Sequence, residues 1–104
     1  MKRIGFKMKL NQGMEAEYKK RHDEIWPELS KLLKDAGIFD YSIFLDRETN
    51  ILFACMKVTD DNTKESLPKE PIMRKWWDYM ADIMEANSDH SPKSSLLIEV
   101  FHID

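Results

Sequence analysis

The spacing of apolar residues at the start of the chain predicts a β-strand. The apolar side chains of this segment are two positions apart: Ile4, Phe6, Met8 and Leu10. Polar and basic residues occupy most of the positions between them. Because successive side chains of a strand point to opposite faces, this alternation is typical of a strand with one face buried.

The period then changes, and residues 12–36 follow a helical pattern. One face is formed by residues three or four positions apart: Met14, Tyr18, His22, Ile25, Leu29, Leu32, Leu33 and Ala36. Such steps indicate an amphipathic helix. Pro27 cannot lie within a helix without a break, so we predict two helices, about 12–24 and 27–36. Asn11 is the expected N-cap of the first, and Gly37 ends the second.

Two strands and a turn are predicted next. Residues 41–45 form an apolar strand, residues 46–50 are rich in turn-forming types, and residues 51–58 form a nearly continuous apolar strand. Cys55, in the middle of the third strand, is expected to be a small core residue.

The last third of the chain predicts one more helix and one more strand. Residues 60–71 are polar and hold at most one helical turn before Pro68. Pro71 begins a helix whose apolar positions continue to Met84, and the final strand covers residues 96–103.

The resulting order is βαββαβ, which predicts an α+β, ferredoxin-like fold: a four-stranded antiparallel sheet with helices on one face. We expect residues 1–104 to form a single domain. Several strands are apolar on both faces; in the second, for example, Tyr41, Ile43 and Leu45 lie on one face and Phe44 on the other. A bare apolar sheet face must be covered, and with no chain left over a second copy is the expected cover, so we predict a homodimer.

Composition and charge narrow the function classes. The chain has 104 residues, 42% of them hydrophobic and 34% charged, with a formal net charge of −3. That balance argues against nucleic acid as a partner, because phosphate binding needs a basic surface. No apolar stretch approaches the roughly 20 residues of a membrane span, and the single Cys55 cannot form an internal disulfide. We therefore expect a cytoplasmic protein that does not bind membranes.

Metal and cofactor chemistry is not indicated by any motif. The chain lacks paired cysteines, a His-x-x-x-His pair, a clustered carboxylate set and a glycine-rich phosphate loop. We therefore expect no metal and no cofactor, which leaves a small site of histidine, tyrosine and tryptophan.

His22 and the Trp76–Trp77 pair are the candidate functional side chains. His22 has Tyr18 four residues earlier, on the same helix face. It is either a partly buried structural histidine or a general acid or base, since imidazole titrates near neutral pH. Adjacent helical residues point about 100° apart, so one indole can be buried while the other reaches the rim of a cleft.

The chain also resembles a known family. The residues that carry the resemblance are Tyr18–His22, Ile25–Leu29, Tyr41–Asp46, Leu52–Ala54, Trp76–Met80 and Ser91–Pro92. Together they are similar to the L-rhamnose mutarotase family, from the first strand to the last. The resemblance departs from the family pattern in residues 60–74 and in the loop Asn87–Pro92, where Ser88 and His90 differ. If that loop rims the site, His90 bears on which deoxy sugar is preferred.

What the resemblance implies is a dimeric α/β barrel that interconverts the α and β anomers of L-rhamnopyranose. It implies His22 as the proton donor and Tyr18, Tyr41, Trp76 and Trp77 as sugar-binding residues. The chemistry needs only general acid–base catalysis to open and close the ring.

Several alternatives stay open at this point. The partner of His22 in proton transfer is Tyr41, Asp46 or a bound water. The substrate is L-rhamnose or another deoxy sugar such as L-fucose. Rival classes on the same dimeric barrel are a haem-handling or monooxygenase-type protein and a non-enzymatic module that senses a metabolite.

Overall fold

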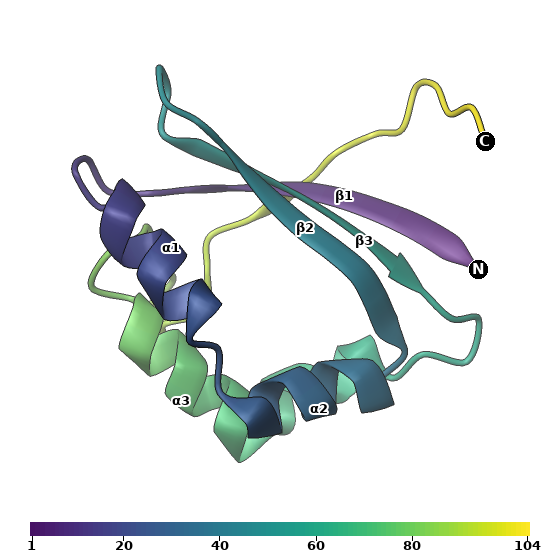
Figure 1. The fold of residues 1–104 in the computed structure, drawn as a ribbon. Helices are drawn as coiled ribbons and strands as arrows, with labels where there is room; N and C mark the ends of the chain where they lie inside the picture. Colours follow the sequence, from purple (N-terminus) through teal and green to yellow (C-terminus); the bar gives the residue numbers. More distant parts are fainter.

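The computed structural model describes all residues 1–104 as an antiparallel sheet with its helices on one face (Figure 1). The strands are β1 (Lys2–Lys9), β2 (Ile38–Asp46), β3 (Ile51–Val58) and β4 (Ser95–Leu96). The helices are α1 (Glu15–Asp23), α2 (Pro27–Asp35), the 3₁₀ helix η1 (Lys64–Lys69) and α3 (Pro71–Met80). The sheet order is β2-β3-β1-β4, with every neighbouring pair antiparallel. The predicted fold class, α+β with a four-stranded antiparallel sheet, is confirmed.

The inward face of the sheet forms the core with the helices. β1 and β3 pair so that Met8 lies opposite Leu52 and Phe6 opposite Ala54. Side chains directly opposite each other share a face, so the period-two pattern of β1 continues into that of β3. Met8, Leu52 and Ala54 are all buried, as the alternation in β1 requires.

Both helix boundaries around Pro27 are close to the prediction, but the start of α1 is not. Pro27 is the first residue of α2, and Gly37 follows its end with φ +91°, as a C-terminal glycine does. The expectation that Asn11 caps a helix beginning near residue 12 is wrong. Gly13 has φ +82° and forms a turn with Gln12, so α1 begins at Glu15. The Asn11 amide instead donates to the backbone carbonyl of Asp82.

α3 is shorter than predicted because its last apolar residues serve a different element. The helix ends at Met80, and Ile83 and Met84 are buried beyond it, with Met84 bridged to Leu10 beside the sheet. An apolar spacing that suits a helix also suits a turn packed against the core. The polar segment before α3 holds a short 3₁₀ helix, as expected, although it continues through Pro68 to Lys69.

The last strand is much shorter than the sequence predicts. Only Ser95 and Leu96 pair with β1, and residues 97–104, here called the C-terminal segment, lie outside the sheet and run past its edge (Figure 1). Its apolar side chains are exposed, up to 92% for Val100. The alternation of residues 96–103 specifies strand-like side chains, but a strand forms only where a neighbour pairs with it along its length. Within one chain the segment keeps scattered contacts with β1 and no continuous pairing: the Leu97 N–H donates to the Gly5 carbonyl, and Arg3 contacts Glu99 and His102.

The helix-free face of the sheet is also uncovered in the single chain. Phe44, Phe53 and Cys55 are exposed there, so the expectation that Cys55 is a core residue is wrong for one chain alone. None of the helices has both the length and the apolar character that crossing a membrane requires.

Candidate active site

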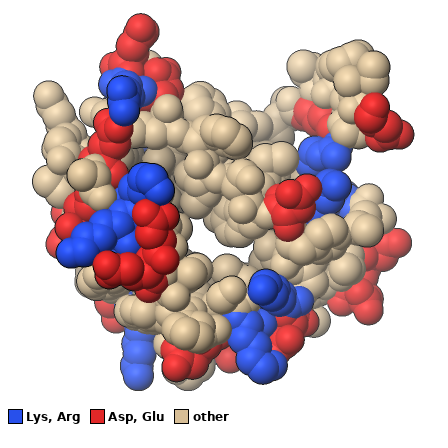
Figure 2. Space-filling view, viewed as in Figure 1, with Lys and Arg blue, Asp and Glu red and all other residues tan.

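A cavity of about 1270 Å³ lies between the inward face of the sheet and the helices. In the space-filling view it opens between β2 and α2 (Figure 2). Small-molecule pockets typically measure roughly 300–1,000 Å³, so this one is ample for a small ligand. More than half of the residues that line it are hydrophobic. A second, mostly apolar cavity of about 80 Å³ lies beside it.

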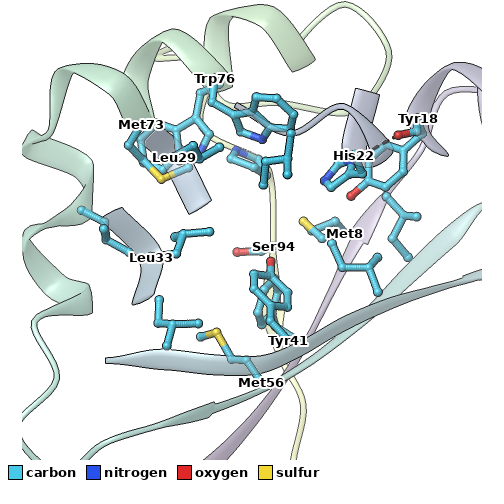
Figure 3. A pocket seen from close by; sticks show the side chains of 18 of the residues that line it. Met8, Tyr18, His22, Leu29, Leu33, Tyr41, Met56, Met73, Trp76 and Ser94 are labelled. Carbon is cyan, nitrogen blue, oxygen red and sulfur yellow. Dashed lines mark hydrogen bonds between the residues drawn. The ribbon is translucent and has the colours of Figure 1, made fainter. Parts of the chain in front are cut away.

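All five residues singled out in the sequence line both cavities: Tyr18, His22, Tyr41, Trp76 and Trp77. They come from three elements, with the first two on α1, Tyr41 on β2 and the indoles on α3. Residues far apart in the sequence thus meet at one end of the cavity (Figure 3).

His22 is held at the cavity wall by its own helix. Its Nδ1 lies 3.0 Å from the backbone carbonyl oxygen of Tyr18, one turn earlier, and only a protonated nitrogen can donate to that oxygen. In the neutral ring the proton is therefore assigned to Nδ1, and Nε2 points into the cavity (Figure 3). The imidazole stacks on the Tyr18 ring at 4.3 Å and meets the edge of Trp76 at 5.3 Å.

The electrostatic surroundings of His22 favour the neutral ring. Burial lowers the pKa of His22 below its ordinary value, and this desolvation outweighs the opposing effects of the Tyr18 carbonyl and of Asp23. A lowered pKa makes the protonated ring a stronger acid when it forms.

The two tyrosine hydroxyls stay protonated at neutral pH. Tyr18 is only 8% exposed, and burial, with a smaller contribution from Tyr41, raises its pKa well above the usual range. Burial of the Tyr41 hydroxyl raises its pKa to about 12, although 39% of the residue's surface is exposed. The side chain points its hydroxyl toward the middle of the cavity (Figure 3). Both groups are therefore neutral hydrogen-bonding partners.

A β-bulge explains why Tyr41 faces inward. Phe39 pairs with Lys57 and Ser42 with Cys55, so Asp40 and Tyr41 together lie opposite a single residue of β3. Asp40 takes φ +49° at this point. One extra residue changes the alternation of the strand, and bulges commonly re-aim side chains beside functional sites. Strand alternation alone from the buried Ile38 would have turned Tyr41 away from the cavity.

The two tryptophans of α3 differ in burial but share the cavity. Trp76 is 6% exposed and Trp77 is half-buried, which agrees with the expectation that one indole is buried and the other lies nearer a rim. The Trp76 ring packs edge-on against Trp26 at 5.1 Å and against Tyr79 at 5.8 Å.

Sequence reasoning missed the side chains behind this wall. Trp26 stacks on Tyr79 at 5.7 Å, and neither residue lines the cavity. Together with Tyr18, His22 and Trp76 they form what we call the aromatic cluster. A signal was present, since Trp26 lies four residues after His22 and Tyr79 three after Trp76.

Two residues considered in the sequence lie outside the cavity. Asp46 accepts hydrogen bonds from the Glu48 N–H and the Thr49 hydroxyl in the β2–β3 turn and does not line the cavity. The loop of residues 87–92 does contribute lining residues, but His90 is turned toward Asp78, with its Nδ1 2.9 Å from the carboxylate.

No group of three or more His, Cys, Asp or Glu side chains is close enough together to hold a metal ion. The polar groups available to a ligand include the His22 imidazole, the two tyrosine hydroxyls and the side chains of Asn87, Ser91 and Ser94. Charged side chains also line the cavity, among them Lys34, Arg47 and Lys64.

Comparisons with known proteins agree on one family. A family model described as L-rhamnose mutarotase matches residues 3–103. The chain is 57% identical to an L-rhamnose mutarotase of Phocaeicola vulgatus and 58% identical to one of Bacteroides thetaiotaomicron, with each pair aligned over 100% of both chains. Among solved structures, it is similar to the crystal structure of an L-rhamnose mutarotase from Formosa agariphila, with a TM-score of 0.93, 54% identity and 100% of both chains covered.

Proposed function

This chain belongs to the L-rhamnose mutarotase family, and we propose that it carries out the family's reaction in the cavity lined by His22. The protein is an aldose mutarotase, an isomerase that interconverts the α and β anomers of L-rhamnopyranose. The comparisons do not favour a haem-handling or monooxygenase-type protein or a metabolite sensor. We propose the cytoplasm as its compartment, because the lone Cys55 cannot form an internal disulfide.

The observation that carries the proposed site is the position of the His22 Nε2. The Tyr18 carbonyl holds Nδ1, which leaves Nε2 as the nitrogen that exchanges protons with a ligand. It does so in a cavity with two neutral hydroxyls and two indoles, a set that suits a polyhydroxylated substrate with one apolar edge.

Ring opening needs one proton delivered and one removed. We propose that protonated His22 donates from Nε2 to the ring oxygen as the C1–O5 bond breaks, while the proton of the anomeric hydroxyl leaves. The products are an open-chain aldehyde and a free hydroxyl at C5, with one proton gained and one lost. Rotation about C1–C2 presents the other face of the aldehyde, and the reverse proton transfers close the ring as the second anomer and restore His22.

The proton of the anomeric hydroxyl leaves through a neutral group. Asp46 is removed from the candidates by its place in the β2–β3 turn. Tyr41 keeps its proton at neutral pH, so it serves as a relay that accepts the proton of the anomeric hydroxyl while it donates its own to a solvent water, or a water accepts the proton directly. Tyr18, also neutral, is proposed to hold a sugar hydroxyl.

Trp76 and Trp77 are proposed to hold the apolar parts of the sugar. A 6-deoxy sugar presents a methyl group and one face of C–H groups, and burying such surface is worth roughly 25 cal/mol per Å². Met8 and Met73 extend the same apolar wall. The sugar hydroxyls then face His22 and the hydroxyls of Tyr18 and Tyr41, and this placement orients the ring oxygen toward His22.

We further propose that the active form of residues 1–104, a single domain, is a homodimer. The support is the apolar surface that one chain leaves bare: Phe44 and Phe53 on the helix-free face, and Phe101 in the C-terminal segment. Exposed apolar surface of this kind marks an interaction surface. A second copy buries the helix-free face and the C-terminal segment together, with the segment of one copy paired along the sheet of the other.

The decisive test is saturation-transfer proton NMR of anomer exchange with L-rhamnose, L-fucose and D-glucose. We expect accelerated exchange with L-rhamnose above the uncatalysed rate, and less or none with D-glucose, whose C6 hydroxyl meets an apolar wall. Binding of L-rhamnose without faster exchange would contradict the proposed mechanism, and faster exchange of L-fucose than of L-rhamnose would reassign the substrate.

A further inference from the structure

Helix α1 carries two residues of the proposed site but has little apolar surface of its own to hold it in place. Of its nine residues only Tyr18 is buried, and most of the others are charged. Helices in proteins are stabilised chiefly by packing of an apolar face, so a helix this polar needs another attachment. The position of His22 depends on that attachment.

Arg21, which precedes His22 in the chain, supplies it. The Arg21 side chain is 10% exposed, and its guanidinium donates to four acceptors. Nε donates to Glu17 at 2.8 Å, within α1. Nη1 donates to the Tyr79 backbone carbonyl at 2.6 Å and to one Asp82 oxygen at 2.8 Å, while Nη2 reaches the other Asp82 oxygen at 3.3 Å.

The same guanidinium also touches the aromatic cluster. Its central carbon lies 4.3 Å from the centroid of the Tyr79 ring, which is cation–π geometry. Tyr79 stacks on Trp26, both rings pack against Trp76, and Trp76 meets the edge of His22. Arg21 is thus linked to His22 twice, through the backbone of α1 and through the packed rings of the other wall.

We propose that Arg21 is a positioning residue, which holds α1 against the end of α3 so that the His22 imidazole keeps its place and its dry surroundings beside Trp76. This inference rests on the proposed function of His22. Arg21 does not line the cavity, so we do not expect it to touch a sugar bound there. It acts by fixing the distance between α1, which carries His22, and α3, which carries Trp76.

A lysine cannot replace this arrangement. The guanidinium is a planar fork that reaches two carboxylate oxygens, a carbonyl and a second carboxylate at once, whereas an ammonium group is a point charge. The Arg21 guanidinium also holds the pKa of the Asp82 carboxyl below its usual range, so the pair stays charged at neutral pH. Removing the Asp82 carboxylate leaves the largely buried Arg21 guanidinium without two of its acceptors.

The test compares Arg21→Lys and Asp82→Asn with Lys20→Gln. Lys20 lies next to Arg21 on α1, is exposed and does not line the cavity. Its replacement therefore changes the charge of the same helix without touching the contacts of Arg21 with Glu17, Tyr79 and Asp82, here called the clamp. We expect kcat for L-rhamnose to fall by about 10²-fold in Arg21→Lys, the size of effect that a misplacement of about 1 Å produces, with KM changed far less. The kcat of Asp82→Asn should also fall, but by less. The kcat of the double variant should be no lower than that of Arg21→Lys alone, and the kcat of Lys20→Gln should equal that of the wild type.

A second readout does not depend on activity. The titratable side chains near His22 are Tyr18 and Asp23 of α1 and Tyr41 of β2, while α3 faces it with the Trp76 indole. If the clamp keeps the ring dry, loosening it admits water, and the His22 pKa followed by NMR should rise toward its ordinary value in Arg21→Lys. Unchanged kcat and unchanged His22 pKa in folded Arg21→Lys would overturn the proposal. A wild-type protein that failed to exchange anomers would instead overturn the proposed function, and the pKa comparison would still test the clamp.

Discussion

The aromatic cluster and the C-terminal segment both carry large apolar side chains, yet they differ in how far those side chains are buried within one chain. In the cluster, His22, Trp26 and Trp76 each contact rings from another part of the same chain. In the segment, the side chains of Val100 and Phe101 are 92% and 77% exposed. The difference separates two proposals: the proposed chemistry rests on contacts within one chain, whereas the proposed homodimer rests on apolar surface that one chain leaves bare.

The largest effect is expected at the cluster, from His22→Ala. Loss of a well-placed acid typically costs roughly 10²–10⁴-fold in rate, so anomer exchange should approach the uncatalysed rate. The fold should persist, since the ring is only part of a wall that Tyr18 and Trp76 also form. NMR exchange spectroscopy measures the rate and circular dichroism the fold. A folded variant that exchanges anomers at the wild-type rate would remove His22 from its assigned part in the reaction.

The next effect concerns the C-terminal segment and would break the contrast directly. Phe101→Glu places a charge where we expect apolar contact with a second copy, so light scattering at micromolar concentration should move from dimer to monomer mass. Asp104→Asn, a small change at the end of the same segment, is the control. Phe44→Glu tests the helix-free face separately, and dissociation by only one of the two variants shows which surface carries the interface. A wild-type monomer at this concentration contradicts the homodimer.

A smaller effect should distinguish the two indoles. Trp76→Ala removes a 6% exposed ring that contacts three others, and large-to-small changes at such positions cost roughly 3–5 kcal/mol of unfolding free energy. Trp77→Ala should cost less stability and mainly weaken sugar binding, because its ring is half-buried at the cavity. Denaturant unfolding gives the first quantity and saturable tryptophan fluorescence quenching by L-rhamnose the second. Wild-type affinity in both variants would take the tryptophans out of the site.

The smallest expected effect is on stability as a function of pH. Because the His22 pKa is lowered in the folded protein, the unfolded chain takes up this proton first as pH falls. The free energy of unfolding should therefore decrease as pH falls below about 6.5, the ordinary histidine value, until the folded-state pKa is passed. His22→Gln should lack this component. Equal pH dependence in the two proteins would mean that the ring is not desolvated.

The types of the elements could be predicted from the sequence, but several of their ends could not. The period of β1 specifies its buried face, and Pro27 specifies where α1 and α2 separate. The end of α3 could not be predicted, because Ile83 and Met84 have helical spacing in the sequence but are buried in the segment that follows the helix. Residues 96–103 have the alternation of a strand, but pairing depends on a neighbouring strand that the pattern does not contain.

The site shows the same limit. Five motif residues lie at one cavity: Tyr18, His22, Tyr41, Trp76 and Trp77. Their roles in catalysis and sugar binding, which the resemblance implies, stay predictions. The alternation of Tyr41, Ile43 and Leu45 placed Tyr41 on the same face as those two residues. Nothing in the spacing indicated the bulge before it, because the conformation of Asp40 depends on pairing with β3. The Arg21 contacts could not be predicted either, because they join residues 58 and 61 positions apart in the chain.

Cys55 places a natural, reactive thiol on the helix-free face of the sheet. It is the only cysteine, and its thiol lies exposed in the middle of β3 in the single chain. Thiol reagents react with an accessible sulfur and are slowed when it is covered. The alkylation rate of the unmodified protein, followed by mass spectrometry across a dilution series, therefore reports how often that face is open to solvent.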